Sequence, residues 1–188
     1  QMCIRDSNEA PSLSNSLAAS SFAENVSTGT TIATASAADP ESQTITYSLS
    51  GTGSGNFAID SAGNITLAAG LDYETATSYS LTLSASDGVN TTNNTLTITV
   101  DDVNEAPSLS NSLAASSFAE NVSTGTTIAT ASASDPESQT ITYSLSGTGS
   151  DKFAVDSAGN ITLSSALDYE TTTSYSLTLT ASDGANST

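Results

Sequence analysis

Carboxylate side chains recur at fixed positions in this chain, and they are the residues best suited to chemistry. Among those that return 96 residues later as the same amino acid, Glu24, Asp39, Glu41, Asp72, Glu74 and Asp87 are matched by Glu120, Asp135, Glu137, Asp168, Glu170 and Asp183. Carboxylate oxygens are the ligands that hard cations such as Ca²⁺ prefer. The chain has no His and its one Cys lies outside the repeat, which disfavours zinc and copper. These residue types predict an oxygen-lined site for a hard cation.

The positions of these acids follow from a tandem repeat that covers almost the whole chain. Residues 8–92 align without a gap to residues 104–188 and differ at 11 of 85 positions. A repeat of this length is the size of one β-sandwich domain. We therefore predict two domains, at residues 8–103 and 104–188. Residues 1–7 do not follow the repeat, and we interpret them as a non-native leader that resembles translated adapter sequence.

Each repeat consists of short alternating segments separated by Gly, Asn, Asp, Ser and Pro, which predicts an all-β fold. Apolar residues occupy every second position of these segments, and Ser or Thr occupy the others. Such alternation is typical of a two-sheet sandwich with one buried and one solvated face on each sheet. In the first repeat we expect seven strands, at Leu17–Phe22, Thr31–Ser36, Ile45–Ser50, Phe57–Asp60, Asn64–Leu67, Ser78–Ser86 and Thr95–Val100.

The order of these strands predicts where the acids lie. If successive strands alternate in direction, Glu24, Asp72 and Glu74 lie at the far end of a domain, away from its N-terminus. Asp39, Glu41 and Asp87, with their copies, then lie at the near end. A linker that contains Asp102 and Glu105 joins the two domains, so we expect eight carboxylates at the junction. They are Glu24, Asp72, Glu74, Asp102, Glu105, Asp135, Glu137 and Asp183, and their mutual repulsion requires counter-charge.

The overall charge excludes several classes of partner. The chain carries 20 acidic residues, two basic residues and a formal net charge of −18. Nucleic acids and anionic membrane surfaces require a basic patch, so both are disfavoured as partners. The chain also lacks an apolar run long enough for a membrane span, and we expect no membrane insertion.

Five short motifs, in order and spacing, resemble those of the cadherin repeat. They are Ala23-Glu24-Asn25, Asp39-Pro40-Glu41, Leu71-Asp72-Tyr73-Glu74, Ala85-Ser86-Asp87-Gly88 and Asp102-Val103-Asn104-Glu105-Ala106-Pro107. The resemblance covers residues 8–188 and implies seven-strand Greek-key sandwiches with up to three Ca²⁺ ions at the junction. Two ions would be held by Glu24, Asp72, Glu74 and Glu105, with help from Asp102 and Glu137. The third would be held by Asn104, Asp135, Glu137 and Asp183.

This resemblance also implies a function, with some departures from the family pattern. The linker is one residue shorter than the family form, and Glu105 stands where the family has Asp. No Trp is present, so adhesion by exchange of a terminal Trp strand is not expected. The near-identical copies are more similar to the stalk of a large bacterial surface or secreted adhesin. We expect calcium-rigidified extracellular repeats, with calcium ions as partners here and with cell-surface proteins or glycans bound by other parts of the protein.

Two other functions remain open. A calcium-dependent glycan-binding module would need exposed aromatic side chains near the acids, so the exposure of Tyr73 and Tyr169 is informative. Calcium-free spacer domains would show no response to calcium. An enzyme is not expected, because a catalytic carboxylate pair normally lies in a cleft, whereas these acids gather at domain ends.

The second repeat is expected to lack its seventh strand, because it ends at Thr188, the counterpart of Thr92. Its core would then lack counterparts of Leu96, Ile98 and Val100, each worth about 1.5 to 3 kcal/mol when buried. We therefore expect the isolated second repeat to be marginally stable or to aggregate, and the natural protein to continue with a similar strand.

Overall fold

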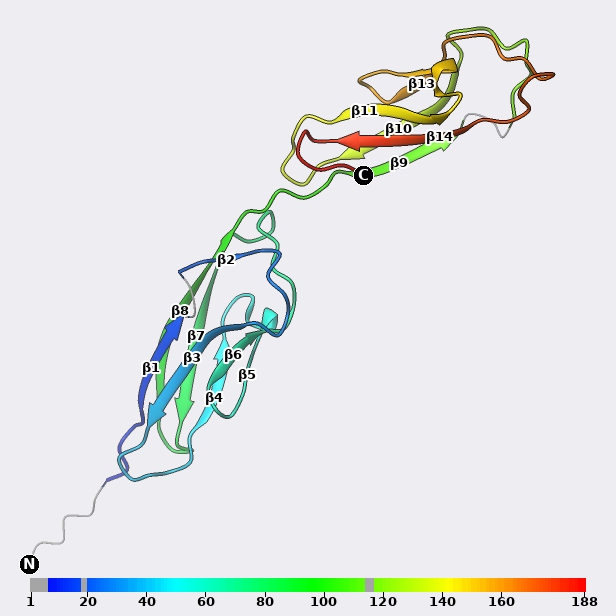
Figure 1. Ribbon diagram of the computed structural model, residues 1–188. Helices are drawn as coiled ribbons and strands as arrows, with labels where there is room; N and C mark the ends of the chain where they lie inside the picture. The colour runs from blue at the N-terminus through cyan, green and yellow to red at the C-terminus, as the bar shows by residue number, and fades with distance from the viewer. Residues whose placement is uncertain (1–6, 18–19, 114–116) are drawn as a thin grey trace, which may run out of the picture. The chain divides into compact units, whose positions relative to one another are not determined.

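The computed structural model describes residues 7–17, 20–113 and 117–188 of the chain (Figure 1). Residues 1–6 of the expected leader lie outside the described part. The chain divides into two units, Gln1–Val103 and Asn104–Thr188. Strands are the main regular elements of both, and the described residues also contain two short 3₁₀ turns, η1 (Ser54–Asn56) and η2 (Ser150–Lys152). No helix among the described residues is long and apolar enough to cross a membrane.

Unit 1 contains two four-stranded sheets. The first has the order β1-β3-β6-β5 and the second β2-β8-β7-β4. All paired strands are antiparallel except β2 and β8, which run parallel. The strands are β1 (Ser12–Leu17), β2 (Phe22–Ala23), β3 (Thr31–Ala38), β4 (Thr46–Ser50), β5 (Phe57–Ile59), β6 (Asn64–Leu67), β7 (Ser78–Ser86) and β8 (Thr91–Asp101).

The core of unit 1 lies between these sheets and follows the alternation of the sequence. Leu83 of β7 and Ile98 of β8 are fully buried, as is Ile65 of β6 on the opposite sheet. The residues between them in β7 and β8 are mostly Ser and Thr, and they face outward with exposed or half-exposed side chains. The predicted all-β sandwich is therefore confirmed.

The first and last strands of unit 1 differ from the ranges expected. One strand was expected at Leu17–Phe22, of which residues 18 and 19 lie outside the described part. Instead, β1 pairs with β3 in one sheet and β2 pairs with β8 in the other, so the chain changes sheets between them. The last strand begins at Thr91 rather than Thr95, because its pairing with β7 extends from Ser86↔Thr91 to Ser78↔Thr99.

Unit 2 repeats the first sheet of unit 1, with the order β12-β13-β10-β9, whereas among its described residues only β11 and β14 form the second sheet. The expectation that the second copy has no last strand is confirmed for the described residues. Its tightly buried core is smaller, centred on Ile128, Ala129 and Ile161. The strands are β9 (Ser108–Leu113), β10 (Thr127–Ser134), β11 (Thr142–Thr148), β12 (Phe153–Val155), β13 (Asn160–Leu163) and β14 (Ser176–Ser182).

Candidate metal centre

Three carboxylates meet at the far end of unit 1. Oxygens of Glu24, Glu74 and Asp102 lie within 4.8 Å of one another. Glu24 directly follows β2 and Asp102 directly follows β8, and the parallel pairing of these strands sets Ala23 opposite Asp101. The Glu24 amide also donates a hydrogen bond of 3.1 Å to the Asp101 carbonyl. The small β2 strand thus brings together two acids that are 78 positions apart in the sequence.

Glu24 is the most firmly held member of this group. Its side chain is only 7% exposed. Its Oε1 accepts a hydrogen bond of 2.8 Å from the Val103 amide, and its Oε2 accepts one of 2.7 Å from the Tyr73 amide. Each carboxylate oxygen has a second lone pair, so both remain able to bind a cation. Glu24 therefore offers pre-oriented ligand atoms at little further cost in side-chain entropy.

Asp72 was predicted to belong to the same set, and in unit 1 one of its oxygens also closes a turn. Its Oδ1 accepts a hydrogen bond of 2.8 Å from the Thr75 amide and closes the turn before β7. In unit 2 its counterpart Asp168 closes the same turn and also lies within 4.8 Å of Glu120 and Glu170. The pKa of Asp168 is below its ordinary value, chiefly because the Thr171 hydroxyl donates a hydrogen bond to it.

The near end of each unit carries a hydrogen-bond network around one Asn. In unit 2, Asn104 Nδ2 donates to Asp183 Oδ2 at 2.8 Å, Asn104 Oδ1 accepts from Gln139 Nε2, and the Asn104 carbonyl accepts from Asn186 Nδ2 at 2.8 Å. The same contacts occur in unit 1 between Asn8 and its partners Asp87, Gln43 and Asn90. Gln139 and Asn186 were not among the predicted site residues. Their recurrence in both copies could not identify them as site residues, because most residues recur between the two copies.

A carboxylate oxygen without a hydrogen-bond donor lies buried at the near end of both units. Asp39 Oδ1 accepts hydrogen bonds of 2.9 Å from the Glu41 and Gln43 amides, and Asp135 Oδ1 accepts one of 2.8 Å from the Gln139 amide. In both residues Oδ2 is buried and has no donor among the described residues. Burying such an oxygen is costly unless something compensates its charge. A bound cation would do so.

The other acids at the near end of unit 2 are also close together. Carboxylate oxygens of Glu105 and Glu137 lie within 4.8 Å of each other. The neighbouring Glu105 side chain holds the pKa of Glu137 below its ordinary value. Burial opposes ionisation of Asp183, but hydrogen bonds from Asn104 and from the Asn186 amide outweigh it and lower its pKa. Glu137 and Asp183 are therefore suited to remain charged and to bind a cation at neutral pH.

The exposure of Tyr73 and Tyr169 bears on the glycan-binding alternative. Tyr73 is half-buried and packs against the core of unit 1, so only part of its ring is open to a ligand. Tyr169 is 63% exposed. The two residues occupy matching positions, so the difference reflects how each unit is packed rather than a shared aromatic binding surface.

Comparisons with known proteins agree on one family. A family model described as "Cadherin domain" matches residues 19–101 and 115–188. The chain is 38% identical over 175 residues to the protocadherin-like wing polarity protein stan of Drosophila melanogaster, and 35% identical over 184 residues to protocadherin Fat 4 of Mus musculus. These alignments cover 84% and 91% of the chain. They span only 5% and 4% of the two relatives.

Solved structures support the same relationship. The chain is 28% identical to Drosophila N-cadherin EC1-4, with a TM-score of 0.57, and the match covers 96% of this chain and 48% of that one. It is 25% identical to human protocadherin-24 EC1-2, with a TM-score of 0.56 and coverage of 93% and 87%.

Proposed function

Since this chain belongs to the cadherin family, we propose that its two repeats bind Ca²⁺ through the acidic residues at their ends. The observation that carries the proposal is the buried, donor-free Oδ2 of Asp39 and of Asp135. Proteins of this family are adhesion proteins rather than enzymes, which agrees with acids gathered at domain ends. The donor set contains only carboxylate, amide and carbonyl oxygens, and these are the ligands of calcium.

We assign the ligands to two sets that the linker connects. The far set of unit 1 contains Glu24, Asp72, Glu74 and Asp102, and the near set of unit 2 contains Asn104, Glu105, Asp135, Glu137 and Asp183. Only Val103 separates Asp102 from Asn104, so the covalent chain keeps the nearest members of the two sets within about 7 Å. Calcium would supply the positive charge that this group of carboxylates otherwise lacks. A calcium ion bound by ligands from both sets would restrict the motion of the linker between them.

This mechanism suits repeats that act as an extracellular stalk. We propose that the chain lies outside the cell, spaces an adhesive region from a surface, and is stiffened by calcium. Cell-surface proteins or glycans would be bound by other regions of the protein. The high identity between the copies supports a repetitive stalk, and the narrower similarity to bacterial adhesins stays a prediction.

Isothermal titration of the whole chain with CaCl₂ tests the proposal. We expect saturable binding that is weakened by Glu24→Gln and by Asp135→Asn, each of which removes one charged ligand but keeps the side-chain size. Asp151→Asn is the matched control, because Asp151 is exposed and belongs to neither set. The proposal fails if all three variants bind calcium as the unchanged chain does, or if the folded chain binds none.

A further inference from the structure

Gln139 contacts two members of the near set of unit 2 at once. Its backbone amide donates a hydrogen bond of 2.8 Å to Asp135 Oδ1, and its side-chain Nε2 donates one to Asn104 Oδ1. Asp135 directly follows β10, whereas Asn104 lies before β9. One exposed residue therefore joins two of the assigned ligands that come from different segments of the chain.

A tight turn determines where the Gln139 amide points. The Ser138 amide donates a hydrogen bond of 3.1 Å to the Asp135 carbonyl, and Pro136 occupies the second position of this turn, where its fixed φ is favourable. Ser138 has a φ of 60°, which is uncommon for a residue other than Gly. Such a conformation persists only where the surrounding contacts favour it. It directs the next amide, that of Gln139, to Asp135 Oδ1.

This hydrogen bond determines which oxygen of Asp135 is left for a cation. Oδ1 accepts the bond from the Gln139 amide, while Oδ2 is buried and has no donor among the described residues. The contact holds the carboxylate in one orientation before any ion binds. Binding a cation through Oδ2 therefore costs little further side-chain entropy.

The side-chain amide of Asn104 is held in one orientation as well. An ionised carboxylate such as that of Asp183 only accepts hydrogen bonds, so Asn104 Nδ2 faces it and donates to Oδ2 at 2.8 Å. Asn104 Oδ1 then lies on the opposite side of the amide, where Gln139 Nε2 donates to it. The second lone pair of this oxygen remains able to bind a cation.

The same contacts occur at the matching positions of unit 1. The Gln43 amide donates a hydrogen bond of 2.9 Å to Asp39 Oδ1, and Gln43 Nε2 donates one to Asn8 Oδ1. Ser42 also has a φ of 60°, and Asp39 Oδ2 is likewise buried without a donor in the described part of the chain. These contacts are therefore a property of the near end of each repeat and do not depend on how the rest of each unit is packed.

We propose that Gln139 is a positioning residue of the near set. Its backbone and side-chain amides hold Asp135 and Asn104 in the arrangement that binds a cation, before the cation enters. Partners of this kind orient the ligands of many metal sites. The inference rests on the proposed calcium binding and adds the residue that orients the ligands. Gln43 has the same role in unit 1.

Gln139→Met tests the side-chain contact, because methionine keeps the length of the side chain but has no donor. A role in packing alone would survive this substitution. The whole chain is titrated with CaCl₂ and followed by the amide NMR signal of Asn186. We expect the dissociation constant at this signal to rise about three- to tenfold. The matching Asn90 signal of unit 1 should titrate as in the unchanged chain, as should both signals in the control Thr140→Val, at the next exposed residue.

A second measurement needs no calcium. In chelator, nitrogen relaxation should show a lower order parameter for Asn104 Nδ2 in Gln139→Met than in the unchanged chain, because Asn104 Oδ1 has lost its donor. The side chain of Asn8 keeps its own partner, Gln43, and serves as the internal control.

The backbone contact is tested by comparing Ser138→Val with Ser138→Gly. A φ of 60° is unfavourable for a β-branched residue but open to glycine. Only the valine variant should therefore displace the Gln139 amide from Asp135 and weaken calcium binding at the Asn186 signal, by about threefold or more. Equal affinities for the two variants would contradict the role given to this amide.

Three results for Gln139→Met would overturn the proposal. They are an unchanged calcium affinity, an unchanged order parameter for Asn104, and tighter binding, which would mean that Gln139 competes with the cation. If the folded, unchanged chain binds no calcium, the proposed function fails instead. The measurement in chelator would then still decide whether Gln139 holds Asn104, so the two proposals can fail separately.

Discussion

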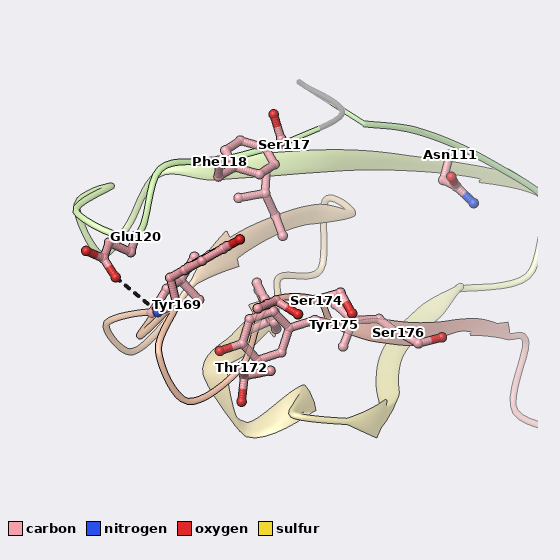
Figure 2. A pocket seen from close by; sticks show the side chains of 14 residues that line it. Asn111, Ser117, Phe118, Glu120, Tyr169, Thr172, Ser174, Tyr175 and Ser176 are labelled. Carbon is pink, nitrogen blue, oxygen red and sulfur yellow. Dashed lines mark hydrogen bonds between the residues drawn. The ribbon is translucent and has the colours of Figure 1, made fainter.

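Glu24 and Glu120 occupy matching positions, yet Glu24 is buried and Glu120 is exposed. The difference comes from their hydrogen bonds. Glu24 accepts hydrogen bonds from two backbone amides, whereas the described contacts of Glu120 include one such bond, from the Tyr169 amide (Figure 2). A sequence pattern identifies an acid at the end of a domain, but it does not say which of its oxygens are already held. For the same reason the turn-closing role of Asp72 and the contacts of Gln43 and Gln139 could not be predicted.

Asp60 and Asp156 provide a pH test that lies away from the proposed ligands. The Asn64 side chain and the Ala62 amide donate hydrogen bonds of 2.8 and 2.9 Å to Asp60, and the Asn64 side-chain contact is the main cause of its lowered pKa. Asp156 has the same environment. Because the folded-state pKa is below the unfolded value, each carboxylate stabilises the fold above its unfolded pKa. That stabilisation is lost as the pH falls through the folded pKa.

We therefore expect the double variant Asp60→Asn, Asp156→Asn to show a weaker loss of stability between about pH 5 and pH 2. Urea midpoints measured across this range in chelator are the readout. Asp151→Asn, which removes one carboxylate at an exposed site outside these turns, is the control for each single charge removed. Parallel curves for the double variant and the unchanged chain would contradict the role given to these turns.

At the scale of elements, two glycines of unit 1 distinguish the energetic cost of a left-handed backbone from the cost of a steric clash. Gly29 and Gly63 both have φ of +85°, but a Cβ on Gly63 would lie 2.4 Å from the Ala35 carbonyl oxygen, whereas a Cβ on Gly29 would have no atom within 4 Å. Gly29→Ala should cost about 1 to 2 kcal/mol from the left-handed backbone alone. Gly63→Ala should cost roughly 2 kcal/mol more, because the clash is with backbone. Equal urea midpoints for the two variants would contradict the close approach of the β5–β6 turn to β3.

The matching strands β7 and β14 test the effect of a second paired neighbour. The sequence of β14, Ser176–Ser182, differs from the matching residues 80–86 of β7 only at Ser84 and Thr180, so their intrinsic exchange rates are nearly equal. We expect the amides of β14 to exchange at least about tenfold faster than those of β7. A difference of about 1.4 kcal/mol between the opening free energies of the two strands is enough to produce this ratio. Hydrogen exchange of the whole chain, followed by NMR, measures both in one sample. Equal protection would mean that the outer neighbour adds little to this strand.

The strands could be predicted from sequence where alternation is strong, as in Leu81, Leu83 and Ala85 of β7. The start of β8 could not, because Thr91 to Asn94 contain no apolar residue and are held in the sheet by pairing with β7. The division of the first strand into β1 and β2 was also missed. It depends on which sheet each segment joins, and local periodicity carries no such information.

At the scale of the whole molecule, the net charge of −18 opposes any close approach of acidic ends. Without calcium, repulsion between the far set and the near set should leave the linker free to hinge. With calcium, ions bound by ligands of both sets should restrict the motion of the linker. We therefore expect small-angle X-ray scattering to show a narrower distribution of interatomic distances in millimolar calcium than in chelator. Identical profiles under the two conditions would contradict the stiffening, although not the binding itself.

The most direct test of the central claim is the melting temperature of the whole chain in chelator and in calcium. At 100 times the dissociation constant, a ligand that binds only the folded state stabilises it by about 2.7 kcal/mol. For domains of this size that corresponds to a rise of about 10 °C or more, and Glu24→Gln with Asp135→Asn should remove most of it. An unchanged melting temperature for the folded chain in millimolar calcium would contradict the proposal that its acidic ends are calcium sites.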